Sequence, residues 1–220
     1  MLPFTRDQFL EIFAAYNGAV WPAQVVAYLL AAIAVALLFR PGRSTDQIVA
    51  AVLAAMWLWT GVAYHGLFFA TINQAAILFA ALFVAEGILI LHAGLAGRLR
   101  FGFSRGWAAS IGVAFILYAA FLYPLIGTAL GHAWPELPMF GVTPCPVTIF
   151  TFGMLLLAKA PVPRLLVVIP FLWSLVGGSA AIFLDVPQDW LLLASGFVAV
   201  PLILRRRAPE PLGTLTTGLR

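Results

Sequence analysis

A single carboxylate, Glu86, interrupts the apolar stretch INQAAILFAALFVAEGILIL, which runs from Ile72 to Leu91. It stands about nine residues inside a predicted membrane span, which places it roughly 13 Å deep at 1.5 Å per residue. An ionised carboxylate costs about 2.5 to 3.5 kcal/mol at that depth, so Glu86 must meet polar partners or carry a proton. The residue is therefore either a proton or cation site, or a carboxyl group that ties two helices together.

Aromatic and hydroxyl side chains on other predicted spans are expected at the same depth as Glu86. Counting along the chain selects Trp57, Thr60, Tyr118, Trp173 and Ser174 as residues that would line a solute or ion site together with it. In this interpretation the two tryptophans form the floor of a central pocket. The alternative is that the tryptophans only fill space between helices.

A second group of chemically active side chains is expected near the outer face. It comprises His65, Asn73, His132, Glu136, Cys145, Asp185 and Asp189. Histidine, thiolate and carboxylate are ligands that zinc or copper would take, so His65, His132, Cys145, Glu136 and Asp185 form an alternative metal site. None of these residues shows a typical ligand spacing, and interfacial loops carry polar residues in any case, so the main prediction includes no metal and no cofactor.

Composition identifies the class of protein that must position these residues. Of 220 residues, 63% are hydrophobic and 9% are charged, and the mean hydropathy is +1.04. A soluble domain needs far more charged surface, so the chain is predicted to be an all-α integral membrane protein whose principal partner is the lipid bilayer. The formal charge of +4 is scattered between apolar runs, which argues against nucleic acid as a partner.

Seven apolar stretches are long enough, or nearly so, to cross about 30 Å of hydrocarbon. They are Val20–Phe39, Ile48–Phe69, Asn73–Leu95, Trp107–Leu125, Val142–Ala158, Leu165–Leu184 and Trp190–Leu204, of which the fifth and seventh are short. Before them, Thr5 and Gln8 have capping-box spacing, and Phe9, Ile12, Phe13 and Tyr16 share one helical face. Residues 1–18 are therefore predicted to form a short interfacial helix.

The charged residues between these stretches predict an orientation. Basic residues follow every odd-numbered stretch: Arg40 and Arg43, then Arg98, Arg100 and Arg105, then Lys159 and Arg164, and finally Arg205, Arg206 and Arg207. The other side carries Arg6 with five acidic residues, namely Asp7, Glu11, Glu136, Asp185 and Asp189. By the positive-inside rule the N-terminus is outside and the tail, residues 205–220, is cytoplasmic.

The first and last thirds of the chain resemble each other in sequence. Trp57 and Gly61 in MWLWTG have the spacing of Trp173 and Gly177 in LWSLVG, and FVA occurs at 83–85 and again at 197–199. Both copies begin on the same side of the membrane, so the predicted arrangement is a parallel repeat. Residues 20–95 form the first three-helix unit, 107–125 a linker helix and 142–204 the second unit.

This three-plus-one-plus-three arrangement resembles that of the SWEET and PQ-loop sugar transporters. In that resemblance Pro22, Pro146 and Pro170 correspond to hinge prolines. The literal Pro187–Gln188 pair is in the wrong place for the family motif, so the likeness is one of architecture. Microbial rhodopsins share the layout, but their retinal needs a lysine in the last span, and the only lysine here, Lys159, is in a loop.

At the level of sequence, four segments resemble an uncharacterised family of bacterial membrane proteins, a domain of unknown function. They are PFTRDQFLEIFAAYN, VWPAQ, WLWTGVAYHGLFFATIN and GHAWPELPMFGVTPCPVTIFTFG. The resemblance covers nearly the whole chain and implies a multi-pass protein of the bacterial cytoplasmic membrane. It implies no activity.

Three functions are consistent with the sequence. The first is a transporter or channel for a small solute, a proton or another ion, with a pocket between the two three-helix units. The second is a non-catalytic structural subunit, which could form a homo-oligomer, and the third is a metal-binding protein or enzyme that uses the outer polar group. The chain has no phosphate loop, dinucleotide fingerprint or nucleophile elbow, which favours a protein that is not an enzyme.

Overall fold

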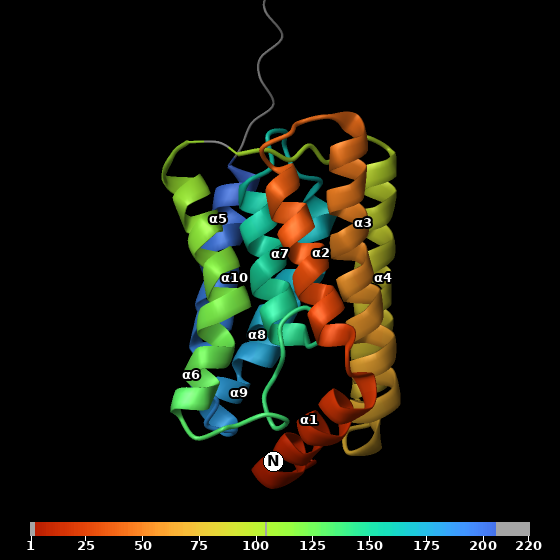
Figure 1. Ribbon diagram of the computed structural model, residues 1–220, viewed down its shortest axis with the longest axis vertical. Helices are drawn as coiled ribbons and strands as arrows, with labels where there is room; N and C mark the ends of the chain where they lie inside the picture. The colour runs from red at the N-terminus through yellow and green to blue at the C-terminus, as the bar shows by residue number, and fades with distance from the viewer. Residues whose placement is uncertain (1–2, 104, 206–220) are drawn as a thin grey trace, which may run out of the picture.

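The computed structural model describes residues 3–103 and 105–205, and the secondary structure of these residues is helical apart from one isolated β-bridge. Most helices lie side by side in an elongated bundle, and α1 lies across one end of it (Figure 1). The helices are α1 (Arg6–Val20), α2 (Ala23–Leu37), α3 (Arg43–Trp59), η1 (Thr60–Phe68), η2 (Phe69–Thr71), α4 (Ala76–Leu95), α5 (Trp107–Leu117), η3 (Tyr118–Leu122), α6 (Tyr123–Ala129), α7 (Pro144–Leu156), η4 (Arg164–Val167), α8 (Val168–Gly178), α9 (Ala180–Phe183) and α10 (Asp189–Leu204).

Four continuous helical segments in the described residues are long and apolar enough to cross a membrane. They are Arg43–Thr71, Ala76–Leu95, Trp107–Ala129 and Arg164–Phe183. A fifth candidate is the pair α1 and α2, which is bent by 80° at its break. The chain is thus an all-helical, apolar protein of the membrane type.

A helix overlaps each of the seven predicted stretches, but three of these helices are shorter than a typical span. The helices α2, α7 and α10 contain 15, 13 and 16 residues. The segment Trp107–Ala129 extends beyond the predicted end at Leu125 because Pro124 falls at the start of α6, where a helix tolerates proline.

The helix α7 lies at the centre of the bundle, and burial decreases from it toward the outer helices. Every residue of α7 is buried, and α3, α5, α8 and α10 pack around it. The helices at the rim expose large apolar side chains instead, such as Leu29, Leu78, Leu117 and Phe197. A helix that is apolar on all sides is typical of a core, and an apolar outer surface is typical of contact with lipid. Composition and packing therefore both indicate a membrane protein.

The N-terminal helix forms with the predicted capping box. The Thr5 hydroxyl accepts from the Gln8 amide at 3.2 Å, and the Gln8 side chain accepts from the Thr5 amide at 2.9 Å. Its apolar face, however, packs on protein, since Phe13 stacks on Tyr64 with ring centroids 5.4 Å apart and Phe9 contacts Phe69. This face therefore covers one end of the bundle, and the placement of the helix at the membrane interface remains a prediction.

The two ends of the bundle differ in charge. The connections between α2 and α3, α4 and α5, and α7 and α8 lie at the end opposite α1 (Figure 1). They carry Arg40, Arg98, Arg100, Arg105 and Lys159, while Arg43 begins α3 and Arg164 begins η4. We call this end the basic end and the other the α1 end. Arg206 and Arg207 of the predicted basic cluster lie outside the described residues.

Candidate functional site

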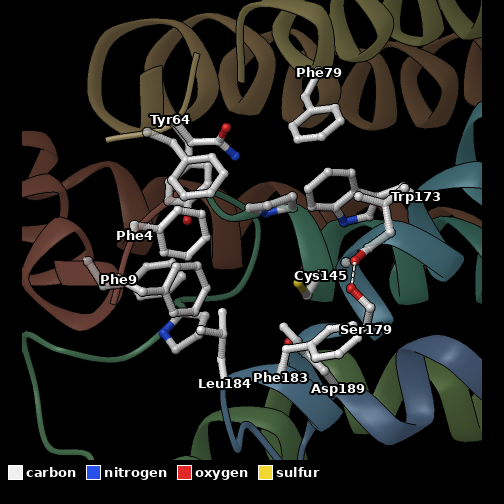
Figure 2. Close-up of a pocket in the computed structure, with 18 residues that line it drawn as sticks. Phe4, Phe9, Tyr64, Phe79, Cys145, Trp173, Ser179, Phe183, Leu184 and Asp189 are labelled. Carbon is white, nitrogen blue, oxygen red and sulfur yellow. Dashed lines mark hydrogen bonds between the residues drawn. The ribbon is translucent and has the colours of Figure 1, made fainter. Parts of the chain in front are cut away.

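A cavity of about 160 Å³ opens near the α1 end of the bundle. One wall comes from η1, η2 and α4, and the opposite wall from α7, α8, α9 and α10, while α1 and the segment before it cover the end. The cavity therefore lies between the group of helices early in the chain and the group late in the chain. Figure 2 shows Phe4, Phe9 and Tyr64 on one side and Trp173 and Cys145 on the other.

Aromatic rings make up much of the lining of this cavity. They belong to Phe4, Phe9, Phe13, Tyr64, Phe69, Phe79, Trp173 and Phe183. Many of the rings support one another, as Tyr64 does by stacking on both Phe13 and Phe69. Rings present a negative face, so a lining of this kind accepts apolar bodies and organic cations.

A polar corner interrupts the aromatic lining where α7, α8 and α10 approach one another. The Tyr123 hydroxyl donates a hydrogen bond of 2.6 Å to Oδ1 of Asp189. The Cys145 thiol lies among Asp189, Tyr123 and Trp173, and the Trp173 indole N–H, which is buried, has no hydrogen-bond partner within the described part of the chain. The corner thus offers an acid, a thiol and a free donor to a bound molecule.

Hydrogen bonds from α1 hold the cover of the cavity in place. The Tyr16 hydroxyl donates to the Val142 carbonyl at 2.7 Å and accepts from the Trp59 indole at 2.8 Å. Burial raises the pKa of Tyr16, so the phenol stays protonated and can donate this bond. Asn17 donates to the carbonyls of Pro135 and Leu137, both at 2.7 Å. These bonds join α1 to the connection between α6 and α7.

Arg6 fixes the same cover from another side. Its Nε donates to the Leu184 carbonyl at 3.1 Å, and its Nη2 lies 2.8 Å from Nε2 of His132. Arg6 therefore links the start of α1 to the two loops that flank the cavity.

A layer of packed rings separates the cavity from Glu86. Phe83 contacts Trp57 at 4.4 Å, His65 at 4.7 Å and Trp173 at 5.1 Å between ring centroids. Phe79 lines the cavity, whereas Glu86 is not among its lining residues. At 1.5 Å per residue Glu86 lies about 10 Å farther along α4 than Phe79.

Glu86 is fully enclosed. Its exposed fraction is 0%, and neither carboxyl oxygen has a hydrogen-bond partner among the described residues. Among the described residues, the polar side chains predicted at its depth therefore supply no hydrogen bond to it. Its role as a proton or cation site remains a prediction.

The side chains predicted to join Glu86 make other bonds. Trp57 donates to Thr151 at 2.9 Å, Thr60 to the Met56 carbonyl at 2.8 Å, Tyr118 to the Gln188 carbonyl at 2.9 Å and Ser174 to the Phe171 carbonyl at 2.7 Å. Trp173 lines the cavity, and the other members of that predicted set do not. Depth along each helix was the only guide, and depth does not determine which face a side chain occupies.

The predicted outer polar group divides into separate environments. Asn73, Cys145 and Asp189 line the cavity together, whereas His132 pairs with Arg6, and Glu136 and Asp185 are exposed. His65 packs between rings, and both of its nitrogens lack a partner among the described residues.

The alternative metal site does not form in the described residues. No group of three or more His, Cys, Asp or Glu side chains there could hold a metal ion. The five proposed ligands were chosen by predicted side of the membrane, and residues that share a side need not share a position.

The three predicted hinge prolines occupy different settings. Pro22 lies at the 80° bend between α1 and α2. Pro146 and Pro170 fall in the first turns of α7 and α8, where proline costs no helical hydrogen bond. Of the three, only Pro22 coincides with a sharp change of direction.

Sequence reasoning missed the aromatic cover and the wide helical turn that carries Tyr64 and His65. The segment η1 is a π-helix that continues α3, and such turns occur often at functional sites. The apolar face of the first helix was the available signal for the cover, because Phe9 and Phe13 on that face line the cavity.

Comparison with known proteins identifies the family of this chain. The model of a family of unknown function, DUF6064, matches residues 6–212. The chain belongs to the DUF6064 family. No curated protein and no solved structure matches the chain. The DUF6064 match includes α1, so the cover of the cavity falls within the family region.

Proposed function

We propose that this DUF6064 protein is a seven-crossing transporter of the bacterial cytoplasmic membrane that carries a small organic cation. The observation that supports it most is the cavity between the early and late helix groups, whose one charged lining residue among the described residues is the acid Asp189. A cation would gain from the aromatic faces and from the carboxylate together. A neutral solute with a hydrogen-bonding end is the nearest alternative occupant.

The orientation we propose follows from the two ends of the bundle. The basic end would face the cytoplasm by the positive-inside rule, and the α1 end would face outward. The cavity at the α1 end would then receive its solute from outside. The short helices α2, α7 and α10 would cross where neighbouring helices or local thinning of the bilayer make up the length.

Transport would require the two helix groups to move relative to each other. We propose that residues 20–95 and 142–204 are parallel repeats, joined by the linker helix, that rock about the cavity. The ring layer of Trp57, Phe83 and Trp173 would act as the closed inner gate, supported by centroid distances of 4.4 and 5.1 Å. Glu86 lies beyond this layer and would serve as the proton or cation site reached after the gate opens.

Uptake into liposomes tests the proposal. Purified protein is reconstituted, and uptake of choline and of phenyltrimethylammonium is measured with 3,3-dimethylbutan-1-ol, the neutral isostere of choline, as competitor. We expect saturable uptake of at least one cation that the neutral alcohol does not inhibit. Asp189→Asn should reduce uptake about tenfold or more, since a lost ion pair of 1.4 kcal/mol corresponds to a factor of ten.

Asp185→Asn is the matched control for the Asp189 variant. Asp185 is an exposed acid in the same region, and its φ of 53° is one that asparagine also adopts. Uptake by this variant should equal that of the unchanged protein. The proposal fails if neither cation enters faster than into empty liposomes, or if the two variants behave alike.

A second function is favoured by the hydrogen bonds that buried hydroxyl groups make within their own helices. Thr60, Thr148, Thr151, Ser174 and Ser195 all donate hydrogen bonds to carbonyls of their own helices. Such internally satisfied polar groups also suit a structural membrane subunit without transport activity. Absence of uptake together with stable association into an oligomer would favour this second function.

A further inference from the structure

A second cavity lies at the basic end of the bundle, and it has a different chemistry. Its volume is about 770 Å³, and it is formed by the connections that follow α2, α4 and α7. Arg43, Arg100 and Lys159 line it, together with one carboxylate, Asp46. We call it the basic cleft.

Backbone contacts hold the walls of the basic cleft together. Phe101 forms an antiparallel bridge with Ala158, and the Lys159 amide donates to the Arg100 carbonyl at 2.7 Å. The Asp46 carboxylate accepts from the Phe101 amide at 2.7 Å. One oxygen of the only acid among the described lining residues is thus bound to the backbone, and this bond also fixes the wall that carries Arg100.

The Lys159 side chain passes close to a glycine. A Cβ on Gly102 would collide with Cε of Lys159 and would lie 2.7 Å from its Nζ. The lysine side chain therefore crosses the bare backbone of Gly102, which places its ammonium group beside the cleft. A side chain at position 102 would require the flexible end of Lys159 to move away.

The groups in the basic cleft match a phosphate. Arginine forks and a lysine ammonium bind phosphate oxygens, and the lining holds three such cations against one carboxylate. The N-terminus of α3 also borders the cleft, since Gly42 and Arg43 both line it. Gly42 is the N-cap residue of α3 and has no side chain, so the N-cap supplies no side-chain bond to the first amides of this helix. The first amides of a helix favour an anion.

We propose that the basic cleft binds a phosphate group, either of an anionic phospholipid or of a soluble phosphate compound. The inference does not depend on the transport proposal, because it concerns other residues at the opposite end of the bundle. Anionic lipid headgroups are expected at this depth if the basic end faces the cytoplasmic leaflet.

The single lysine of the chain allows a direct test. In detergent, Lys159 and the N-terminal amine are the two amines that reductive dimethylation can modify, and peptide mass spectrometry follows each separately. We expect 10 mM inorganic phosphate to slow modification of Lys159 about fivefold or more relative to chloride at equal ionic strength. The N-terminal amine serves as the internal reference and should react at an unchanged rate.

The source of the phosphate is distinguished by repeating the reaction in nanodiscs. Protection by phosphatidylglycerol beyond that given by phosphatidylcholine identifies a lipid headgroup, and protection by free phosphate in detergent identifies a soluble ligand. Arg100→Gln should abolish protection, whereas Arg98→Gln, an exposed arginine of the same connection that does not line the cleft, should retain it. Equal rates in phosphate, lipid and chloride for the unchanged protein would overturn the proposal without any variant.

Discussion

Replacing Glu86 with methionine should make the protein more stable. The carboxyl group has an exposed fraction of 0% and no hydrogen-bond partner for either oxygen among the described residues. A buried polar group without a partner costs about 1 to 3 kcal/mol. Methionine has a similar length, carries no such polar atoms and adapts to irregular space, so Glu86→Met should raise the free energy of unfolding by about 1 to 3 kcal/mol.

Two further variants separate this effect from others. Glu86→Gln keeps an unpaired polar group of the same size, so its free energy of unfolding should change by less than about 1 kcal/mol. Glu11→Met removes an exposed acid of α1 and should stay within about 0.5 kcal/mol of the unchanged protein. If Glu86 serves transport, both replacements at position 86 should lose uptake although one of them gains stability.

Unfolding in mixed micelles with increasing dodecyl sulfate, followed by circular dichroism, measures these differences. A loss of more than about 1 kcal/mol in Glu86→Met would refute the reasoning, because it would mean that the carboxyl group supplies a bond that holds helices together. That outcome would favour the structural interpretation of Glu86.

Three other predictions concern packing and the cover. Gly196→Ala should lower the free energy of unfolding by about 1 to 3 kcal/mol, because its Cβ would collide with Oγ of Ser174. Gly18→Ala is the control and should leave the free energy of unfolding unchanged, because nothing in the described part of the chain lies within 4 Å of a Cβ there. Dodecyl sulfate titration compares the two variants. Thr5→Ala removes the capping box of α1 and should cost about 1 kcal/mol of helix stability, seen as faster amide exchange in residues 6–10 with little change in α7. Phe83→Ala removes the ring that contacts both Trp57 and Trp173, so liposomes that contain this variant should leak phenyltrimethylammonium down its gradient. Liposomes that retain the cation would show that this ring does not block a permeation pathway.

The helices were predictable because lipid imposes a simple rule on sequence. Long apolar runs must be helical where backbone groups cannot meet water, and the run that holds Glu86 is indeed helix α4, Ala76–Leu95. The capping box at Thr5 is a local signal, and it was read correctly. Seven crossings, the orientation and the repeat remain predictions.

The site was less predictable because it depends on which faces of the helices converge. Trp57 and Trp173 were expected to form one floor, yet Phe83 lies between them, and only Trp173 reaches the cavity. We expect Cys145 and Asp189 near the outer face, and that side remains a prediction. Their proximity depends on how α7 and α10 are rotated. Sequence gives the depth of a residue in a span, whereas rotation is set by packing against neighbours.

Chemical access to Cys145 is the most direct test of the proposal that the cavity faces outward. This thiol is the only cysteine of the chain, it lines the cavity and its exposed fraction is 7%. A membrane-impermeant cationic methanethiosulfonate reagent should modify it when applied to the outside of intact cells, and phenyltrimethylammonium should slow that reaction. Modification only from the cytoplasmic side of inverted vesicles, or none from either side although the unfolded protein reacts, would contradict the account.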